Sequence, residues 1–220
     1  GAVSPGHVQQ GGVVLLAGTG AFAHARTRDG RVRHLDGTGP ILGDFGGGYH
    51  IGTMALHAIV RSDWHPRHAT SLRKHVLGRF GVSSPAALFG LGLFARDRSV
   101  VASIAQTVRE EADRGDAIAL RILESAAEAM AETFRDLTDV LGIARDAYTV
   151  VGTGGIIRRS EIYWTHLRDR IAAIAPGFTC CRLSQPPVVS CAIHALKQVL
   201  GSAAGEAVDR LVVQAEALHL

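Results

Sequence analysis

The sequence predicts an α/β domain in which a mixed sheet of about five strands has helices on both faces. Three features of the chain lead to this prediction. Short apolar segments with turn signals open the sequence, a helical insertion follows at about residues 53–141, and the remainder alternates between strand and helix. We therefore expect three antiparallel strands followed by parallel ones.

The opening strands follow from an apolar run and a hairpin sequence. Residues 12–17 form a β-branched apolar segment that is typical of a central strand. Residues 21–28 and 31–35 flank Asp29-Gly30, a dipeptide that strongly favours a hairpin turn. A glycine-rich loop at residues 37–48 then leads into a helix.

The insertion is predicted to be helical, with interruptions in its middle part. A helix is expected at about residues 49–61, whereas Pro and Gly interrupt residues 63–98. Residues 99–114 predict a helix that ends at Gly115, and Asp116 caps the next one. One face of that next helix is assigned to the core by its spacing: Leu123, Ala127, Met130, Phe134, Leu137 and Leu141.

After the insertion the chain returns to the sheet. Residues 147–151 predict a buried strand that runs directly into Gly152-Thr153-Gly154-Gly155. The elements expected beyond it are a helix from Ser160 to about residue 175, a strand at 178–183, a helix at 188–200 and an amphipathic tail at 206–218. One side of the tail is apolar: Val208, Leu211, Val212 and Ala215.

Composition restricts the class of protein. The 47% hydrophobic and 20% charged residues are typical of a soluble globular protein, and no apolar run is long enough to predict a membrane span. No signal-like segment is found, so we expect a cytoplasmic protein. The net charge of +3 is small and the arginines are scattered among acids, which predicts no nucleic-acid partner. The three cysteines lack a C-x-x-C pair, which favours buried thiols over disulfides or a metal cluster.

Two glycine motifs are candidates for a nucleotide site. Gly18-Thr19-Gly20 lies between two expected antiparallel strands, where N–H groups and a threonine hydroxyl can hold phosphates, although a plain hairpin turn explains the tripeptide alone better. Gly152-Thr153-Gly154-Gly155 lies between a strand and a helix. Small residues there would admit a base or a ribose, and close packing of helix on strand explains the motif equally well.

Asp44 is the candidate sugar ligand. It stands in Leu42-Gly43-Asp44-Phe45-Gly46-Gly47-Gly48, where a carboxylate can accept hydrogen bonds from two sugar hydroxyls and glycine allows close approach. The alternative is an aspartate that caps a turn or the helix at Tyr49. Function is favoured slightly, because the loop is more elaborate than a connection requires.

Other common nucleotide and metal sites are not supported. Gly18-x-Gly20-x-x-Ala23 formally matches a dinucleotide fingerprint, but the Asp29-Gly30 turn leaves no room for a crossover helix. Gly152-x-Gly154 has Ile157 in the place of the third glycine, and neither lysine follows a glycine as in a Walker A loop. The eleven histidines show no metal-ligand spacing, so no metal site is assigned.

Taken together, the motifs resemble the bacterial N-acetylglucosamine kinase and BadF/BadG/BcrA/BcrD-type ATPase family, whose fold is actin-like (ribonuclease H-like). VVLLAGTG is similar to the family's second phosphate motif, and RDGRVRHLDGTGPILGDFGGGYHIG to its sugar-loop block. YTVVGTGGIIRRS is similar to the adenosine motif, and SQPPVVSCAIHAL to a helix near the family's C-terminus. Residues 1–220 thereby resemble the C-terminal lobe alone, with the N-terminal lobe absent from the chain.

The resemblance implies ATP and Mg²⁺ as cofactors and a small sugar as substrate. Three groups of residues receive roles: Gly18, Thr19 and Gly20 at the phosphates; Gly152, Gly154 and Gly155 at the adenosine; and Thr38, Gly39, Asp44, Ala21 and Phe22 at the sugar. In such kinases an aspartate takes the proton of the attacked hydroxyl. That base is expected upstream of Gly1, so no catalytic residue is assigned within this chain.

Three positions depart from the family pattern, because Ala21 replaces a common Ser, Thr38 a common Trp and Phe45 a common Glu. The leading hypothesis is ATP-dependent phosphorylation of an amino sugar of the N-acetylglucosamine or glucosamine type, with this chain inactive alone. The alternative is a non-kinase nucleotide-binding or regulatory module whose sugar site is degenerate. A third hypothesis is a pseudo-domain whose tail helix pairs with another chain, and a homodimer is left open.

Overall fold

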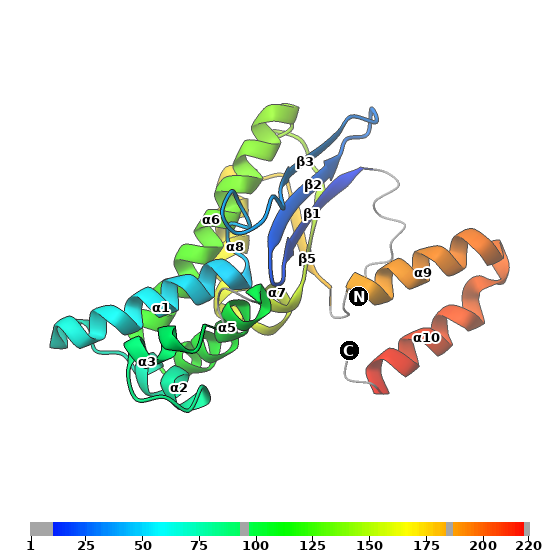
Figure 1. The fold of residues 1–220 in the computed structure, drawn as a ribbon. Helices are drawn as coiled ribbons and strands as arrows, with labels where there is room; N and C mark the ends of the chain where they lie inside the picture. The colour runs from blue at the N-terminus through cyan, green and yellow to red at the C-terminus, as the bar shows by residue number, and fades with distance from the viewer. Residues whose placement is uncertain (1–10, 93–96, 184–186, 218–220) are drawn as a thin grey trace.

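A five-stranded sheet forms the centre of the fold in the computed structural model, which describes residues 11–92, 97–183 and 187–217 (Figure 1). Its strand order is β3-β2-β1-β4-β5. The strands are β1 (Gly12–Ala17), β2 (Ala21–Arg26), β3 (Val32–Asp36), β4 (Thr149–Thr153) and β5 (Thr179–Arg182). The β1–β2 and β2–β3 pairs are antiparallel, whereas β1–β4 and β4–β5 are parallel. The mixed sheet predicted from the sequence is confirmed.

Helices fill the insertion between β3 and β4 and follow the later strands. Their bounds are α1 (Gly48–Trp64), α2 (Leu72–Arg79), α3 (Pro85–Gly90), α5 (Arg98–Asp113), α6 (Ala117–Leu141), α7 (Gly155–Arg159), α8 (Glu161–Ile174), α9 (Pro187–Leu200) and α10 (Gly205–Ala217). Short 3-10 turns lie at Pro66–His68 and Gly201–Ala204. The five-residue helix α7 was not predicted, because a segment of that length shows no hydrophobic period.

The predicted helix caps form. The Asp116 carboxylate accepts the N–H groups of Ile118 and Ala119, each at 2.9 Å, at the start of α6. Gly115, before it, has a φ of +93°, the left-handed region that favours glycine after a helix. The Ser160 hydroxyl accepts the N–H of Tyr163 at 3.2 Å and caps α8.

The main core extends from one face of the sheet through α6 and α8 to α1, α2 and α5. Val13, Leu15 and Ala17 point into it from β1, and the predicted apolar face of α6 is buried along its length. Phe134 is fully buried in α6 and meets the ring of Phe178 edge-on, with centroids 5.6 Å apart. This packing fixes the strand ends from which the glycine motifs emerge.

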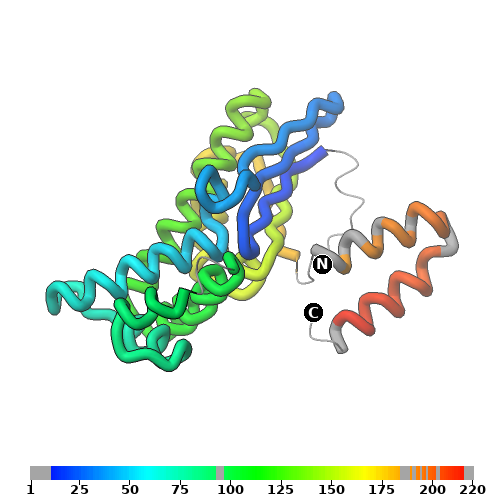
Figure 2. The backbone as a smooth tube through the Cα atoms, in the orientation of Figure 1, coloured from blue at the N-terminus to red at the C-terminus, as the bar shows by residue number. Residues whose placement is uncertain are grey.

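Helices α9 and α10 form a hairpin with a smaller core of their own. In Figures 1 and 2 this hairpin lies on the side of the sheet away from α6. Val189 and Ile193 of α9 pack with Ala215 of α10, and the other apolar side chains of α10 that join them are Val208, Leu211 and Val212. The apolar side of the tail is therefore partly covered within the chain, because α9 folds back against it.

The burial of the cysteines follows the prediction in part. Cys180 packs against the main core and Cys181 lies on the opposite face, as neighbours on a strand should, but both thiols are half-buried rather than buried. Burial raises the pKa of Cys180 to about 11. The side chain of Cys191 lies outside the described residues.

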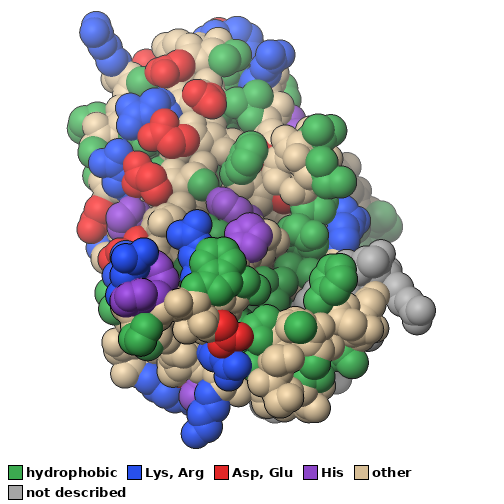
Figure 3. Space-filling model, turned by 60° about the vertical axis from the view of Figure 1, so that its left-hand side comes forward, with side chains coloured by type: hydrophobic (Ala, Val, Ile, Leu, Met, Phe, Trp, Pro, Cys, Tyr) green, Lys and Arg blue, Asp and Glu red, His purple; other side chains and the backbone are tan. Residues whose placement is uncertain are grey.

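The surface carries charges of both signs. Figure 3 shows acidic and basic side chains interspersed along one edge of the face it displays. No helix in the described ranges is long and apolar enough to span a bilayer.

The core of α6 generates a stability prediction. Phe134→Ala should lower the free energy of unfolding by about 3–5 kcal/mol, because it leaves a cavity beside Phe178. Val140→Ala on the same helix removes a side chain that is 58% exposed and should change stability by less than about 0.5 kcal/mol. Urea unfolding followed by circular dichroism measures both, and equal losses would contradict the assigned core.

Candidate functional site

The turn between β1 and β2 is the first part of the site. Gly18-Thr19-Gly20 joins the two antiparallel strands, which confirms that this motif is not a dinucleotide fingerprint. Helix α1 begins directly on this turn. The N–H of Gly48 donates to the carbonyl of Gly18 at 2.7 Å, and the N–H of Tyr49 donates to that of Thr19 at 2.9 Å. Thr19 is exposed at the tip of the turn.

The second glycine motif lies beside this turn. Leu16 of β1 pairs with Thr153 of parallel β4, so the residues that follow the two strands emerge at the same sheet edge. Gly155 lies there with nothing within 4 Å of a Cβ built on it. A side chain at position 155 would project into open space.

The other two glycines of this motif have packing roles. A Cβ at Gly152 would approach the Trp164 ring to 2.5 Å, and one at Gly154 would lie 2.3 Å from the Ala17 carbonyl oxygen. Gly154 also has a φ of +94°. Close packing, the alternative weighed for this motif, describes both positions, and their contact with a nucleotide remains a prediction.

One pocket joins the turn, helix α5 and the start of α7. Its volume is about 450 Å³, within the range of small-ligand sites. Gly18, Thr19 and Gly155, three of the six residues that the resemblance assigns to the nucleotide, line it together. Helix α5 supplies a polar wall that was not predicted: Ser99, Ser103, Gln106 and Arg109. Their spacing of three and four residues places them on one helical face, which is the signal that could have identified them.

The charged side chains that line this pocket in the described part of the chain are arginines. Arg109 also pairs with Asp113 at 3.3 Å and Glu110 at 3.6 Å, two carboxylates that do not line the pocket. Arg159, on α7, is exposed. Burial, followed by the positive charge of Arg159, lowers the pKa of neighbouring Arg158. The pocket therefore combines open backbone, hydroxyl groups and positive charge, which is the chemistry that binds a polyanion.

Asp44 lies on the other side of the same turn. Its Oδ1 accepts the N–H of Ala21 at 3.2 Å, and its carboxylate leaves no room for a Cβ at Gly20, which would approach it to 2.7 Å. The side chain is largely buried, and the residue has a φ of +61°. Asp44 does not cap α1, whose N-cap is Gly47 without a side-chain bond. The carboxylate is thus fixed against the phosphate turn.

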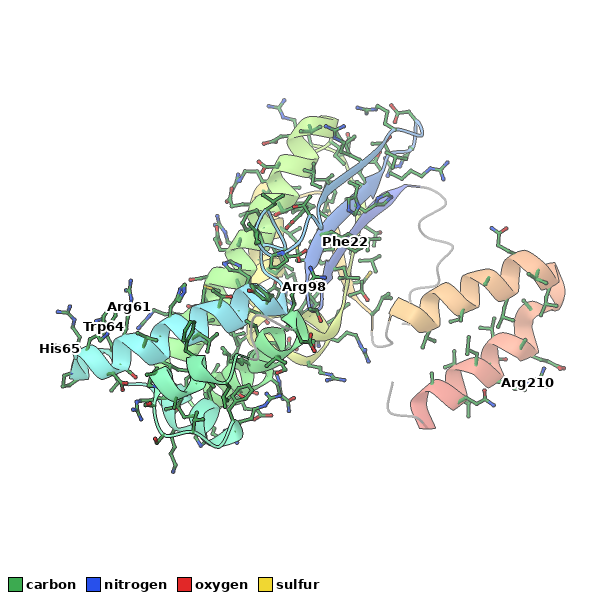
Figure 4. The ribbon with its side chains drawn as sticks, viewed as in Figure 1. Phe22, Arg61, Trp64, His65, Arg98 and Arg210 are labelled. Atoms are coloured by element: carbon green, nitrogen blue, oxygen red, sulfur yellow. The ribbon has the colours of Figure 1, made fainter. Side chains whose placement is uncertain are left out.

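The remaining predicted sugar residues are less uniformly placed. Thr38 is exposed, and Gly39 turns the loop with a φ of +88°. The methyl group of Ala21 points into the core, so only its N–H reaches Asp44. Phe22 is half-buried against His34, with ring centroids 4.9 Å apart. Figure 4 shows that Phe22 comes from β2 and Arg98 from the start of α5, near the loop.

Three side chains hold the Asp44 loop in place, and the sequence analysis assigned none of them. His50 Nδ1 accepts the N–H of Gly46 at 3.0 Å; burial lowers the pKa of His50, which keeps this nitrogen a neutral acceptor. Tyr163 Oη donates to the Gly46 carbonyl at 3.0 Å, and complete burial raises the pKa of this hydroxyl. The third is Asp36, whose carboxylate accepts backbone N–H groups of the loop.

No cluster of three or more His, Cys, Asp or Glu side chains that could hold a metal occurs within residues 11–92, 97–183 and 187–217. Mg²⁺ is commonly bound through substrate phosphates and only one or two carboxylates.

Two relatives of the chain are named as N-acetylglucosamine kinases. The chain is 28% identical over 188 residues to an N-acetyl-D-glucosamine kinase of Dictyostelium discoideum, covering 84% of this chain and 59% of that protein. It is 26% identical over 168 residues to an N-acetylmuramic acid/N-acetylglucosamine kinase of Clostridium acetobutylicum, covering 76% of this chain and 55% of that protein. The chain thus spans little more than half the length of these relatives.

Solved structures share the fold. A candidate N-acetylglucosamine kinase from Chromobacterium violaceum matches with a TM-score of 0.59 and 23% identity over 79% of this chain and 56% of that one. Another from Porphyromonas gingivalis matches with a TM-score of 0.57 and 16% identity over 83% of this chain and 59% of that one. These likenesses support the actin-like fold.

The family model of the BadF/BadG/BcrA/BcrD ATPases matches residues 1–174, which include both glycine motifs, the Asp44 loop and the polar face of α5. The match covers well over half of the chain. By sequence, the chain belongs to the BadF/BadG/BcrA/BcrD ATPase family.

Proposed function

We propose that this chain forms the nucleotide-binding half of an ATP-dependent sugar kinase that acts on an amino sugar of the N-acetylglucosamine or glucosamine type. One observation carries the proposal. The Gly18-Thr19 turn and Gly155, which are more than a hundred residues apart, line one pocket whose charged side chains are arginines, and Asp44 is bound to the far side of the same turn. A phosphate donor and a hydroxyl-bearing acceptor would thus meet across a three-residue turn.

The relatives support this proposal. Two proteins that share more than a quarter of their residues with this chain over the aligned region are named as N-acetylglucosamine kinases, one of which also carries N-acetylmuramic acid in its name. Membership of an ATPase family supports ATP as the donor. That this chain acts on such a sugar, by the same reaction, is part of the proposal.

Each part of the pocket has a role in this mechanism. The exposed Thr19 hydroxyl and the turn backbone bind terminal phosphates, and Arg109 and Arg159 attract the anionic chain. Gly155 leaves space for the nucleoside. Bound ATP supplies the transferable phosphoryl group, whose charge Mg²⁺ shields.

Asp44 orients the acceptor in this scheme. Its Oδ1 already accepts the Ala21 N–H, so its remaining lone pairs can receive sugar hydroxyls. We place the general base on a companion lobe outside these residues, since the chain spans only 55% and 59% of the curated relatives. Domain closure would then bring the base to the attacked hydroxyl and exclude water.

The alternative is a nucleotide-binding or regulatory module with a degenerate sugar site. The side chain of Phe45 is 49% exposed on the sugar loop, and the Ala21 methyl group lies in the core. Neither side chain offers a hydrogen bond to a sugar. The two functions differ in their response to sugar, which calorimetry can measure.

Gly155→Leu should weaken ADP binding at least about tenfold, or 1.4 kcal/mol, because the new side chain enters the open pocket. Gly78→Leu is the matched control, since a Cβ at Gly78 on α2 also meets nothing within 4 Å and lies away from the pocket. Isothermal titration calorimetry with ADP measures both affinities. Unchanged ADP affinity in Gly155→Leu would contradict the proposal that the nucleotide binds in this pocket.

Asp44→Asn should lower the affinity of the full-length protein for N-acetylglucosamine by about tenfold or more, because a charge-assisted acceptor becomes a neutral amide. Its ADP affinity should stay unchanged, and the exposed Asp139→Asn on α6 should affect neither ligand. Titrations of glucosamine and N-acetylglucosamine with and without ADP decide between the two functions. Sugar binding strengthened by ADP supports the kinase, whereas ADP binding with no sugar response supports the module.

Residues 1–220 alone should show no sugar-dependent transfer of phosphate from ATP, because the proposed base is supplied by another lobe. A coupled assay of ADP release with N-acetylglucosamine tests this expectation. Turnover by this chain alone would place the base within it and overturn that part of the proposal.

A further inference from the structure

Asp36 closes the loop that carries Asp44. It is the last residue of β3 and has a φ of +68°. Its Oδ1 accepts the N–H of Gly37 at 2.8 Å and that of Asp44 at 2.5 Å, and its Oδ2 accepts the N–H of Phe45 at 2.8 Å. One carboxylate therefore binds the backbone at both ends of the loop.

The loop backbone lies directly on this carboxylate. A Cβ built at Gly43 would lie closer than 2.5 Å to Asp36 Oδ1 and 2.5 Å from Thr38 Oγ1. Any side chain at position 43 would displace Asp36 or the loop. The glycine before Asp44 thus permits the contact that Asp36 makes.

The contact determines where the Asp44 carboxylate points. The backbone of Asp44 is in the left-handed region, which is unfavourable for a non-glycine residue unless surrounding bonds hold it. Its own N–H and the next one, on Phe45, both donate to Asp36. From this position the side chain of Asp44 reaches the N–H of Ala21 and lies against Gly20.

We propose that Asp36 is a positioning residue for sugar binding: its carboxylate holds the 37–45 loop so that Asp44 faces the acceptor. The inference rests on the proposed function of Asp44. A carboxylate is required because all three groups it meets are N–H donors. An asparagine would turn an NH₂ group toward one of these donors and leave that N–H without an acceptor.

The nucleotide pocket provides an internal reference. It lies across the Gly18-Thr19-Gly20 turn and does not include the 37–45 loop. Loss of the Asp36 contacts should therefore change sugar affinity and leave ADP affinity unaltered. A general loss of stability would weaken the binding of both ligands.

The test compares Asp36→Asn with Asp29→Asn in the full-length protein. Asp29 lies in the turn between β2 and β3, and its carboxylate accepts bonds from Thr27 and Arg31 without reaching the loop. In Asp36→Asn, hydrogen–deuterium exchange should accelerate in peptides covering residues 37–47. The Kd for N-acetylglucosamine should rise about tenfold or more, with the Kd for ADP within about twofold of the parent value. Asp29→Asn should change none of these quantities.

A second variant keeps the test decisive if Asp36→Asn does not fold. Asp36→Gly removes the carboxylate and tolerates the φ of +68°. Hydrogen–deuterium exchange of the loop that is unchanged in the variant would overturn the positioning role. If the unsubstituted protein binds sugar, a variant that binds it with the same affinity would also overturn that role. If the parent binds no sugar but loop exchange still accelerates, the proposed function fails while the hold of Asp36 on the loop stands.

Discussion

Helix α1 begins on the carbonyl groups of the β1–β2 turn, and the rest of the site depends on this contact. The N–H groups of Gly48 and Tyr49 would otherwise lack partners at a helix start. Gly47 and Gly20 lie so close that a Cβ on Gly47 would be 2.7 Å from the Gly20 carbonyl carbon. This approach requires glycine at position 47, whereas Gly20 is required because a Cβ there would meet the Asp44 carboxylate at 2.7 Å. It fixes the turn between the two halves of the site.

The two halves differ in how they are built. On one side, the parallel pairing of β1 and β4 brings Gly155 beside the turn, and α5 closes the pocket with a polar face. On the other side, Asp36, His50 and Tyr163 fix an irregular loop through hydrogen bonds to its backbone. The first half depends on sheet topology and the second on individual side chains. Substitutions should therefore be tolerated more readily in the pocket wall than in the loop anchors.

Much of the fold could be predicted from the sequence because its signals are local. The Asp29-Gly30 hairpin, the Asp116 cap and the apolar face of α6 each follow from short patterns, and all three occur. The pairing of the two glycine motifs was inferred from a family resemblance, and Gly18, Thr19 and Gly155 line one pocket. The ends of strands and the five-residue helix α7 were harder to predict, because neither shows a hydrophobic periodicity that can be detected.

The contacts that shape the site could not be read from the sequence. Tyr163 is 117 residues from Gly46, and nothing local indicates that its hydroxyl supports the loop. Asp36 looks like an ordinary turn residue until the loop folds back onto it. The sequence allows Gly152 and Gly154 to serve packing or a ligand, and the structure shows their packing contacts with Trp164 and Ala17. A glycine needed for packing and one needed for a ligand are identical in sequence, so only tertiary contacts separate them.

The central claim is that the pocket between the β1–β2 turn, α5 and α7 binds a nucleotide. Photo-crosslinking with 8-azido-ADP, followed by peptide mass spectrometry, tests it most directly. Adducts that excess ADP suppresses should fall in peptides from Arg98–Asp113 of α5 or Gly155–Arg159 of α7. ADP-sensitive adducts confined to other elements, such as α9 and α10, would contradict the claim.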